Sequence, residues 1–171
     1  IEPGYAEAHN NLGNVLRDSC DLVAAVESYK KAIRIKPDYV EAYYSLGTSY
    51  QELGNLKETV RCYEQVIELR PNLTGTLNNL GNILRELGRS DEAIMQYEKA
   101  IEIDPNFVEV YFNIGATFQE LDRLDKALKF YNKAIEIKPD YAEAQNNLGV
   151  AFKDLKDFDS AIQAYQKAIE I

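Results

Sequence analysis

The strongest constraint on the fold of this chain is a strict 34-residue repeat that runs through all 171 residues. A proline, a glycine and a tyrosine each recur at this spacing. Self-similarity at such a period indicates a helical repeat array, in which each unit buries its apolar face against its neighbours. The repeating residues are Pro3, Pro37, Pro71, Pro105 and Pro139; Gly13, Gly47, Gly81, Gly115 and Gly149; and Tyr29, Tyr63, Tyr97, Tyr131 and Tyr165.

The second repeat predicts two amphipathic helices. Apolar residues recur at three- and four-residue spacing between residues 40 and 50, and again between residues 56 and 67. Gly54 predicts the break between the two helices, because glycine readily adopts the left-handed conformation that ends a helix. Pro71 cannot continue a helix and so predicts the end of the second one.

The same pattern predicts a pair of helices in every repeat. Asp38 with Glu41, and Asn55 with Glu58, have the spacing of capping boxes and are expected to mark helix starts. The expected ranges are about 7–19 and 22–34, 41–53 and 56–68, 75–87 and 90–102, 109–121 and 124–136, and 143–155 and 158–170.

The small and large residues of the third repeat are those of the tetratricopeptide repeat: Leu80-Gly81, Leu84, Ala93, Tyr97, Ala100 and Pro105. The chain resembles this family over its whole length. The resemblance implies an all-α fold, a right-handed superhelical solenoid of five tandem units in which the first helix of each pair lines a concave face. We expect one array over residues 1–171, cut from a longer array, with units at about 4–37, 38–71, 72–105, 106–139 and 140–171.

The amino-acid composition limits which partners the protein can bind and in which compartment it is expected. The formal net charge of −9 argues against nucleic-acid backbones and anionic membranes as partners, and no run of residues is long and apolar enough to span a membrane. Cys20 and Cys62 lie in different repeats without metal-ligand spacing. They favour free thiols in a reducing compartment over a disulfide, and hence an intracellular protein, cytoplasmic or nucleocytoplasmic.

The sequence gives little support to catalysis. His9 is the single histidine and is expected to fill a packing position. The chain has no Gly-rich phosphate loop and no metal motif. We therefore predict a protein that is not an enzyme, with no catalytic residue, no metal and no cofactor.

A row of asparagines is the first candidate for a binding site. Asparagine is not favoured in the middle of a helix, and its amide can both donate to and accept from the backbone of an extended peptide. The row resembles the repeat domain of O-GlcNAc transferase and its plant relatives, where such asparagines hold substrate peptides. The alternative is that each amide bonds the backbone of a neighbouring repeat and only stabilises stacking. The row consists of Asn11, Asn79, Asn113 and Asn147, with Ser45 in the second repeat.

Two further positions alternate between odd and even repeats, which gives a 68-residue higher period. On the concave face this would place aromatic and basic side chains alternately along the groove; the alternative is an inherited duplication of two repeats without a present role. The alternating residues are Asn10, Tyr44, Asn78, Phe112 and Asn146, and Arg17, Gln51, Arg85, Gln119 and Lys153.

In every repeat, an acidic residue directly follows the second of these alternating positions, the one that holds Arg17 in the first repeat. This row either attracts a basic segment of a partner or is an ordinary solvated helix face. It consists of Asp18, Glu52, Glu86, Glu120 and Asp154.

The function predicted from these patterns is a non-catalytic protein–protein interaction scaffold that binds an extended peptide along its concave face. One alternative is the substrate-selecting arm of a larger enzyme, such as a protein glycosyltransferase. Another is a self-assembling structural scaffold, because the apolar face of the last helix has no polar cap. In that case we expect end-to-end association, with the face of Tyr165 meeting the region of Ala8 and Leu12 of another copy.

Overall fold

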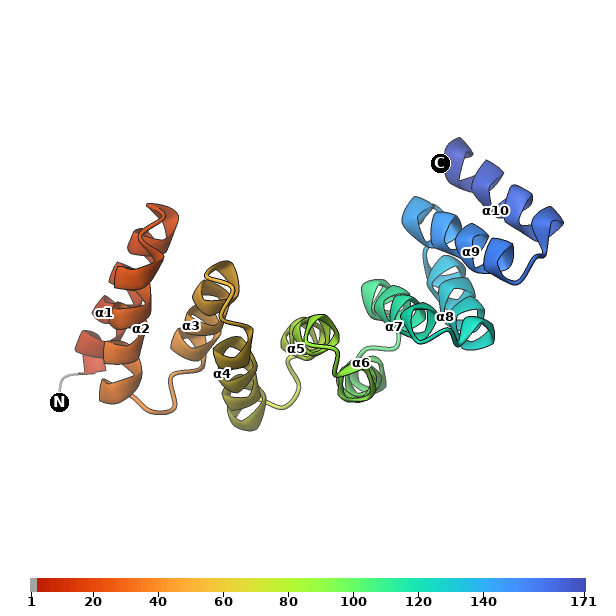
Figure 1. The fold of residues 1–171 in the computed structure, drawn as a ribbon. Coiled ribbons are helices and arrows are strands. Elements are labelled where there is room, and N and C mark those ends of the chain that lie inside the picture. Colours follow the sequence, from red (N-terminus) through yellow and green to blue (C-terminus); the bar gives the residue numbers. More distant parts are fainter. Residues whose placement is uncertain (1–2) are drawn as a thin grey trace. The chain divides into compact units, whose positions relative to one another are not determined.

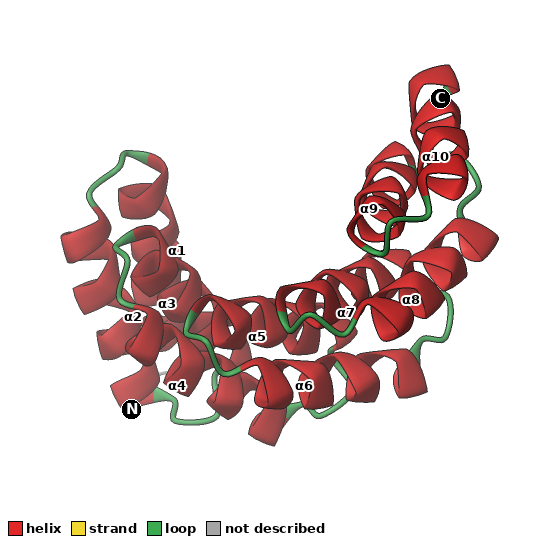
Figure 2. Ribbon diagram, turned by 45° about the vertical axis from the view of Figure 1, so that its right-hand side comes forward, coloured by secondary structure: helices red, strands yellow, loops and turns green. Residues whose placement is uncertain are grey.

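The structure is a computed structural model that describes residues 3–171. These residues form ten α-helices joined by short loops (Figure 2), and none of them belongs to a strand. The predicted all-α fold of five helix pairs is therefore confirmed. Contacts group the chain into two compact units, Ile1–Leu87 and Gly88–Ile171, and we describe each unit by itself. The single array over residues 1–171 stays a prediction.

The first unit contains five helices, which follow one another along the chain (Figure 1). Each helix packs against the next one, and α1 also contacts α3. The first helices of the repeats, α1 and α3, thus lie next to each other. The helices are α1 (Pro3–Asp18), α2 (Leu22–Ile35), α3 (Val40–Glu52), α4 (Leu56–Leu69) and α5 (Thr74–Glu86).

The second unit repeats this arrangement. Each helix again packs against the next, and the first helices α7 and α9 contact each other. The helices are α6 (Ser90–Ile103), α7 (Val108–Glu120), α8 (Leu124–Ile137), α9 (Ala142–Asp154) and α10 (Phe158–Glu170).

Most helix boundaries lie within one residue of the prediction, and the start of α1 is the exception. It begins at Pro3, whereas the sequence pattern placed its start near residue 7. A proline fits the first turn of a helix, because the backbone N–H that it lacks has no partner there.

The predicted capping boxes are wrong. The residue that precedes α3 is Tyr39, and its side chain makes no capping hydrogen bond. Asn55 does precede α4, but its side chain does not cap the helix either. Glu41 instead pairs with Arg70, at 3.3 Å between carboxylate and guanidinium. Side-chain caps occur at two other helices, where aspartates accept from a backbone N–H: Asp21 before α2 and Asp157 before α10.

The turn after each first helix closes through a left-handed residue. In the second repeat this residue is Gly54, with φ 74°, and the N–H of Asn55 then donates to the carbonyl of Tyr50 at 2.8 Å. This geometry satisfies carbonyls that the end of a helix leaves without partners. Three other repeats place a residue with a side chain at the same position, Cys20 (φ 65°), Asp122 (φ 56°) and Lys156 (φ 63°).

Paired helices come close together where a tyrosine ring of one helix lies on a glycine of the other. Tyr29 of α2 is fully buried, and its ring lies so near Gly13 of α1 that a Cβ on the glycine would come within 2.5 Å of it. Tyr131 and Gly115 repeat the arrangement at 2.7 Å. Real Cβ atoms do not tolerate such distances, so the period of glycines and tyrosines records a steric requirement.

We predict that Gly13→Ala lowers the free energy of unfolding by about 1–2 kcal/mol. The added methyl collides with the Tyr29 ring, and the cost of overpacking exceeds the gain in helix propensity. The matched control is Gly75→Ala in α5, where no atom lies within 4 Å of the added Cβ, and where we expect a gain of about 0.5–1 kcal/mol. Urea unfolding followed by circular dichroism measures both changes. Equal effects at the two glycines would contradict the packing described here.

We predict that Lys156→Gly raises the free energy of unfolding by about 0.5–1 kcal/mol. The left-handed conformation of Lys156 costs a residue with a Cβ about 1–2 kcal/mol, and the greater freedom of glycine in the unfolded chain offsets part of the gain. Gly54→Lys places the same strain in the second repeat and should destabilise the protein by a similar amount. A loss of thermal stability in Lys156→Gly would show that the φ angle there carries no strain.

Candidate functional site

The residues predicted to bind a peptide lie on the first helices of the repeats. We call their surface the first-helix face and treat it separately in the two units. In the first unit it comprises Asn10, Asn11, Tyr44, Asn78 and Asn79, and in the second unit Phe112, Asn113, Asn146 and Asn147.

In the first unit, the structure brings Tyr44 and Asn79 together. Tyr44 is exposed, and its ring packs on that of the buried Tyr63, with 5.7 Å between centroids. The Asn79 amide nitrogen of α5 donates to the Tyr44 hydroxyl of α3 at 3.2 Å. This part of the face therefore combines an aromatic surface with an amide that is held in place.

Asn10 differs from the other residues of the first-helix face. Only 6% of it is exposed, and its side-chain oxygen has no hydrogen-bond partner among the described residues. A buried amide cannot contact a ligand in this structure, so we leave Asn10 out of the candidate site. Asn11 is exposed and Asn78 is half-buried.

In the second unit, Phe112 forms the apolar part of the face. Its ring lies between two tyrosines, with centroid distances of 5.8 Å to Tyr131 and 5.3 Å to Tyr141. Phe112 itself stays half-buried. Burial raises the pKa of Tyr141, and the nearby carboxylates of Glu143 and Glu109 add to the effect. The Lys138 ammonium group also lies near this aromatic group, 5.0 Å from the centre of the Tyr141 ring.

Asn146 and Asn147 begin a chain of hydrogen bonds that runs from the surface into the core. The Asn146 amide donates to the Asn147 oxygen at 3.4 Å, and the Asn147 amide donates to the Tyr131 hydroxyl at 3.5 Å. Both distances are long for hydrogen bonds. The Tyr131 hydroxyl in turn donates to the Gln119 side-chain oxygen at 2.7 Å. Asn146 is the exposed outer end of this chain.

A groove of about 650 Å³ opens beside these residues. Its floor comes from α7 and α9 and its opposite wall from α10. Three residues of the predicted site thus meet in one cavity together with apolar side chains. The lining residues are Phe112, Ala142, Glu143, Asn146, Asn147, Tyr165, Ala168 and Ile169.

The asparagine amides that are expected to hold a peptide already have partners within the protein at three positions. Asn79 and Asn147 both donate to tyrosine hydroxyls of a preceding repeat, and Asn113 also has an interaction partner. The alternative expectation, bonds to a neighbouring backbone, does not describe these contacts either, since the acceptors are side chains. An amide has two N–H groups and an oxygen, so one such bond does not use its full hydrogen-bonding capacity.

The 68-residue alternation has a structural basis in the even repeats. In the second repeat the Tyr63 hydroxyl donates to Gln51 at 3.2 Å, and Tyr44 packs on the Tyr63 ring. In the fourth repeat Gln119 and Phe112 contact Tyr131 in the same way. The two alternating positions therefore change together because they touch the same tyrosine. The sequence patterns did not predict this role of the tyrosine hydroxyl. The only indication of it was that the two positions alternate in step, as residues with a shared contact would.

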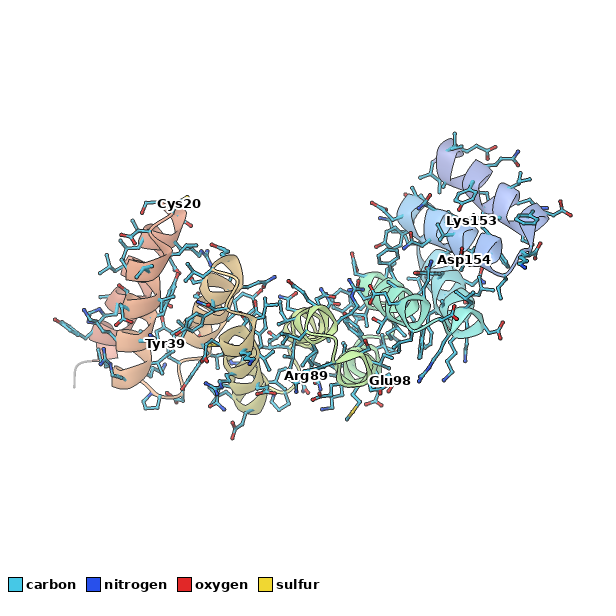
Figure 3. All side chains as sticks on the ribbon, viewed as in Figure 1. Cys20, Tyr39, Arg89, Glu98, Lys153 and Asp154 are labelled. Atoms are coloured by element: carbon cyan, nitrogen blue, oxygen red, sulfur yellow. The ribbon has the colours of Figure 1, made fainter. Side chains whose placement is uncertain are left out.

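The acidic row is exposed along its whole length. At the end of α9, Lys153 and Asp154 lie side by side (Figure 3), with 3.9 Å between their charged groups. Exposed pairs at this distance contribute little to stability. The exposed acidic residues are Asp18, Glu52 and Glu86 in the first unit and Glu120 and Asp154 in the second.

The single histidine and the two cysteines lie apart from the candidate site residues named above. His9 packs edge-on against Tyr5 at 5.1 Å, and residues 3–171 contain no cluster of metal-ligating side chains. Cys62 is buried, which raises the pKa of its thiol to about 12, and Cys20 is exposed at the end of α1 (Figure 3). No helix within residues 3–171 has the length and apolarity that a membrane span needs.

Comparison with protein families identifies the repeat. The profile described as "TPR repeat" matches residues 21–54 and 81–122. Profiles described as "Tetratricopeptide repeat" match residues 40–73, 62–95 and 107–171. The helix pairs and these matches define an all-helical repeat protein. The chain belongs to the tetratricopeptide repeat family.

Solved structures share the fold. A crystal structure of MamA has a TM-score of 0.88 and 25% identity, and the match covers 92% of each chain. MamA from Desulfovibrio magneticus RS-1, at 20% identity, has a TM-score of 0.89 over 97% of this chain and 94% of that one. YrrB, described as "a TPR protein with an unusual peptide-binding site", has a TM-score of 0.79 and 26% identity over 95% and 84% of the two chains. No curated protein sequence matches the chain.

Proposed function

We propose that the chain is a non-catalytic interaction scaffold that binds an extended peptide in the groove of its second unit. The observation that carries the proposal is that the amides of Asn146, which is exposed, and Asn147, which is half-buried, meet apolar side chains in one groove of about 650 Å³. Apolar cavities with a few polar groups are typical binding sites. The family and the similarity to YrrB, a tetratricopeptide repeat protein with a peptide-binding site, support a protein-interaction role.

The groove offers contacts both to the backbone and to the side chains of a peptide. Asn146 at the outer end of the hydrogen-bond chain can donate to a backbone carbonyl and accept from a backbone N–H. Phe112, Tyr165 and Ile169 provide apolar surface for side chains. Because the amides contact the backbone, binding tolerates variation of the peptide sequence, and the apolar wall selects among peptides.

The charge of the site favours a basic peptide. Glu143 lines the groove and is exposed, no lysine or arginine is among the lining residues, and the chain carries a formal net charge of −9. Electrostatic complementarity of this kind mainly raises the rate of association and excludes acidic partners. We therefore assign the partner to extended segments that combine apolar and basic residues.

We predict that the double variant Asn146→Ala/Asn147→Ala weakens peptide binding by about 5- to 150-fold, because each lost hydrogen bond contributes about 0.5–1.5 kcal/mol. The probes are fluorescent peptides selected from a random-sequence display library, measured by anisotropy. The matched control is Gln163→Ala, at an exposed position of α10 outside the groove. Methylation of the backbone nitrogens of the peptide should reduce the affinity for the unaltered protein as well.

Circular dichroism of each variant separates loss of binding from loss of fold, since Asn147 also contacts Tyr131. Asn146→Ala alone changes an exposed residue and should keep the fold. A folded double variant that binds as tightly as the unaltered protein would contradict the site. Unchanged affinity for N-methylated peptides would contradict recognition of the backbone.

A further inference from the structure

The fourth repeat carries a cluster of aromatic rings at the surface of α8. The Phe130 ring stacks on that of Phe118, with 5.6 Å between centroids, and on that of Tyr111, with 6.5 Å. Phe118 and Tyr111 are buried, whereas Phe130 is half-buried. The positions equivalent to Phe130 in the other repeats hold smaller, non-aromatic residues: Ser28, Cys62, Gln96 and Ala164.

The helix pairs do not require an aromatic ring at this position. Ser28 and Cys62 are both buried at the equivalent places of the first and second repeats, so a small side chain is sufficient there. Phe130 instead leaves part of a large apolar ring in contact with water, which forgoes the stabilisation that full burial gives. The packing of the repeat therefore does not account for this ring.

A second groove, of about 430 Å³, opens over the Phe130 and Tyr111 rings. We call it the α8 groove, because all but one of its lining residues belong to that helix. The Tyr111 hydroxyl donates to the Pro105 carbonyl at 3.1 Å, which holds the ring in place. Within the second unit, α6 precedes α7, and α9 and α10 follow α8 (Figure 1). The lining residues are Tyr111, Lys129, Phe130, Asn132, Lys133 and Glu136.

Lysines give the α8 groove a positive charge. Lys126, Lys129 and Lys133 follow one another at three- and four-residue spacing and so lie on one face of the helix. The Lys126 ammonium group lies 5.1 Å from the centre of the Phe118 ring, beside the aromatic cluster. Lys133 pairs with Glu136 at 3.0 Å, but both side chains are accessible to water, and such pairs are weak. Two lysines and one glutamate line the groove, in a chain with a formal net charge of −9.

This row of lysines occurs in the fourth repeat alone. At the three equivalent positions, each of the other repeats carries a single basic residue. The positive charge thus coincides with the one repeat that has an aromatic ring at the place of Phe130. The equivalent residues are Ala24, Glu27 and Lys31 in the first repeat, Glu58, Arg61 and Gln65 in the second, Glu92, Met95 and Lys99 in the third, and Ser160, Gln163 and Lys167 in the fifth.

We propose that the α8 groove binds an acidic segment of a partner protein that carries an aromatic residue. The aromatic side chain stacks on Phe130, and carboxylates on either side of it pair with the lysines. Aromatic pairs attract each other beyond the effect of burial alone. The lysines favour an acidic partner and reject a basic one, because electrostatic complementarity sets specificity.

The spacing of the lysines sets the spacing of the acidic residues in the partner. Lys126 and Lys133 are seven positions apart, which is about 10 Å along a helix with a rise of about 1.5 Å per residue. An extended chain covers about 10 Å in three residues. The matching segment therefore has acidic residues at positions i and i+3, with the aromatic residue between them.

The α8 groove is separate from the groove that contains Asn146 and Asn147. The two share no lining residue, and the charged side chains that line them differ in net sign. A basic and an acidic segment can therefore occupy the second unit at the same time. This proposal does not depend on the peptide site at Asn146 and Asn147.

We predict saturable binding of the acetylated peptide Gly-Gly-Asp-Phe-Ser-Asp-Gly-Gly, measured from chemical-shift changes in NMR spectra of the isotope-labelled protein. Lys129→Glu should weaken binding about 3- to 30-fold, because an attraction between charges becomes a repulsion. Phe130→Ser should weaken it about 2- to 12-fold, because a ring contact is lost. The matched control is Arg61→Glu, which makes the same change of charge at the equivalent exposed position of the second repeat. It should bind like the unaltered protein, and so should Asn146→Ala/Asn147→Ala.

Circular dichroism establishes that the variants are folded, and Phe130→Leu, which also lacks the ring, replaces Phe130→Ser if the latter unfolds. A peptide with Asn in place of both Asp residues, or with Ala in place of Phe, should bind more weakly. No binding at about millimolar peptide concentration would overturn the proposal. An equal loss in Lys129→Glu and Arg61→Glu would show attraction to net charge alone, and a loss in Asn146→Ala/Asn147→Ala would place the peptide in the other groove. Either result would also overturn it.

Discussion

A tyrosine ring that lies directly on a glycine of the paired helix fixes the helix spacing in the first, second, fourth and fifth repeats. Tyr29 and Tyr131 are fully buried in these contacts, and the glycines beneath them have no room for a Cβ. The distance between the two helices of a pair is therefore set by the thickness of one aromatic ring. Since this contact requires a glycine and a tyrosine at fixed positions, the period of Gly and Tyr is the most informative pattern of the sequence.

The same tyrosines connect this core to the first-helix face. The hydroxyl of Tyr131 bonds Gln119 and receives the Asn147 amide, while its ring supports Phe112. A side chain at the centre of the repeat thus contacts one polar and one apolar residue of the candidate groove, Asn147 and Phe112. Residues held in this way lose little conformational freedom when a ligand binds, which favours affinity. This is how a packing requirement produces a preorganised surface.

The repeat pattern of the sequence predicts the fold well, and the binding role of the residues that it singles out stays a prediction. Regular spacing defines all five helix pairs, because it records which side chains must be buried in every repeat. The bond from Asn79 to Tyr44 joins two residues 35 positions apart, and its existence depends on side-chain rotamers that no period encodes. The burial of Asn10 likewise sets it apart from the equivalent Asn146, although both are asparagines at the same place in the repeat. The missing caps at Tyr39 and Asn55 show that a sequence spacing allows a hydrogen bond but does not require one.

A double-mutant cycle at Gly115 and Tyr131 tests the central claim most directly. Gly115→Ala in the unaltered protein should be destabilising, because the new methyl meets the Tyr131 ring at 2.7 Å. In a Tyr131→Ala background, which itself costs about 3–5 kcal/mol, the same change meets no ring and should be neutral or stabilising by up to about 1 kcal/mol. Free energies of unfolding from urea titrations give the coupling between the two sites. An equal cost of Gly115→Ala in both backgrounds would show that the ring does not set the helix spacing.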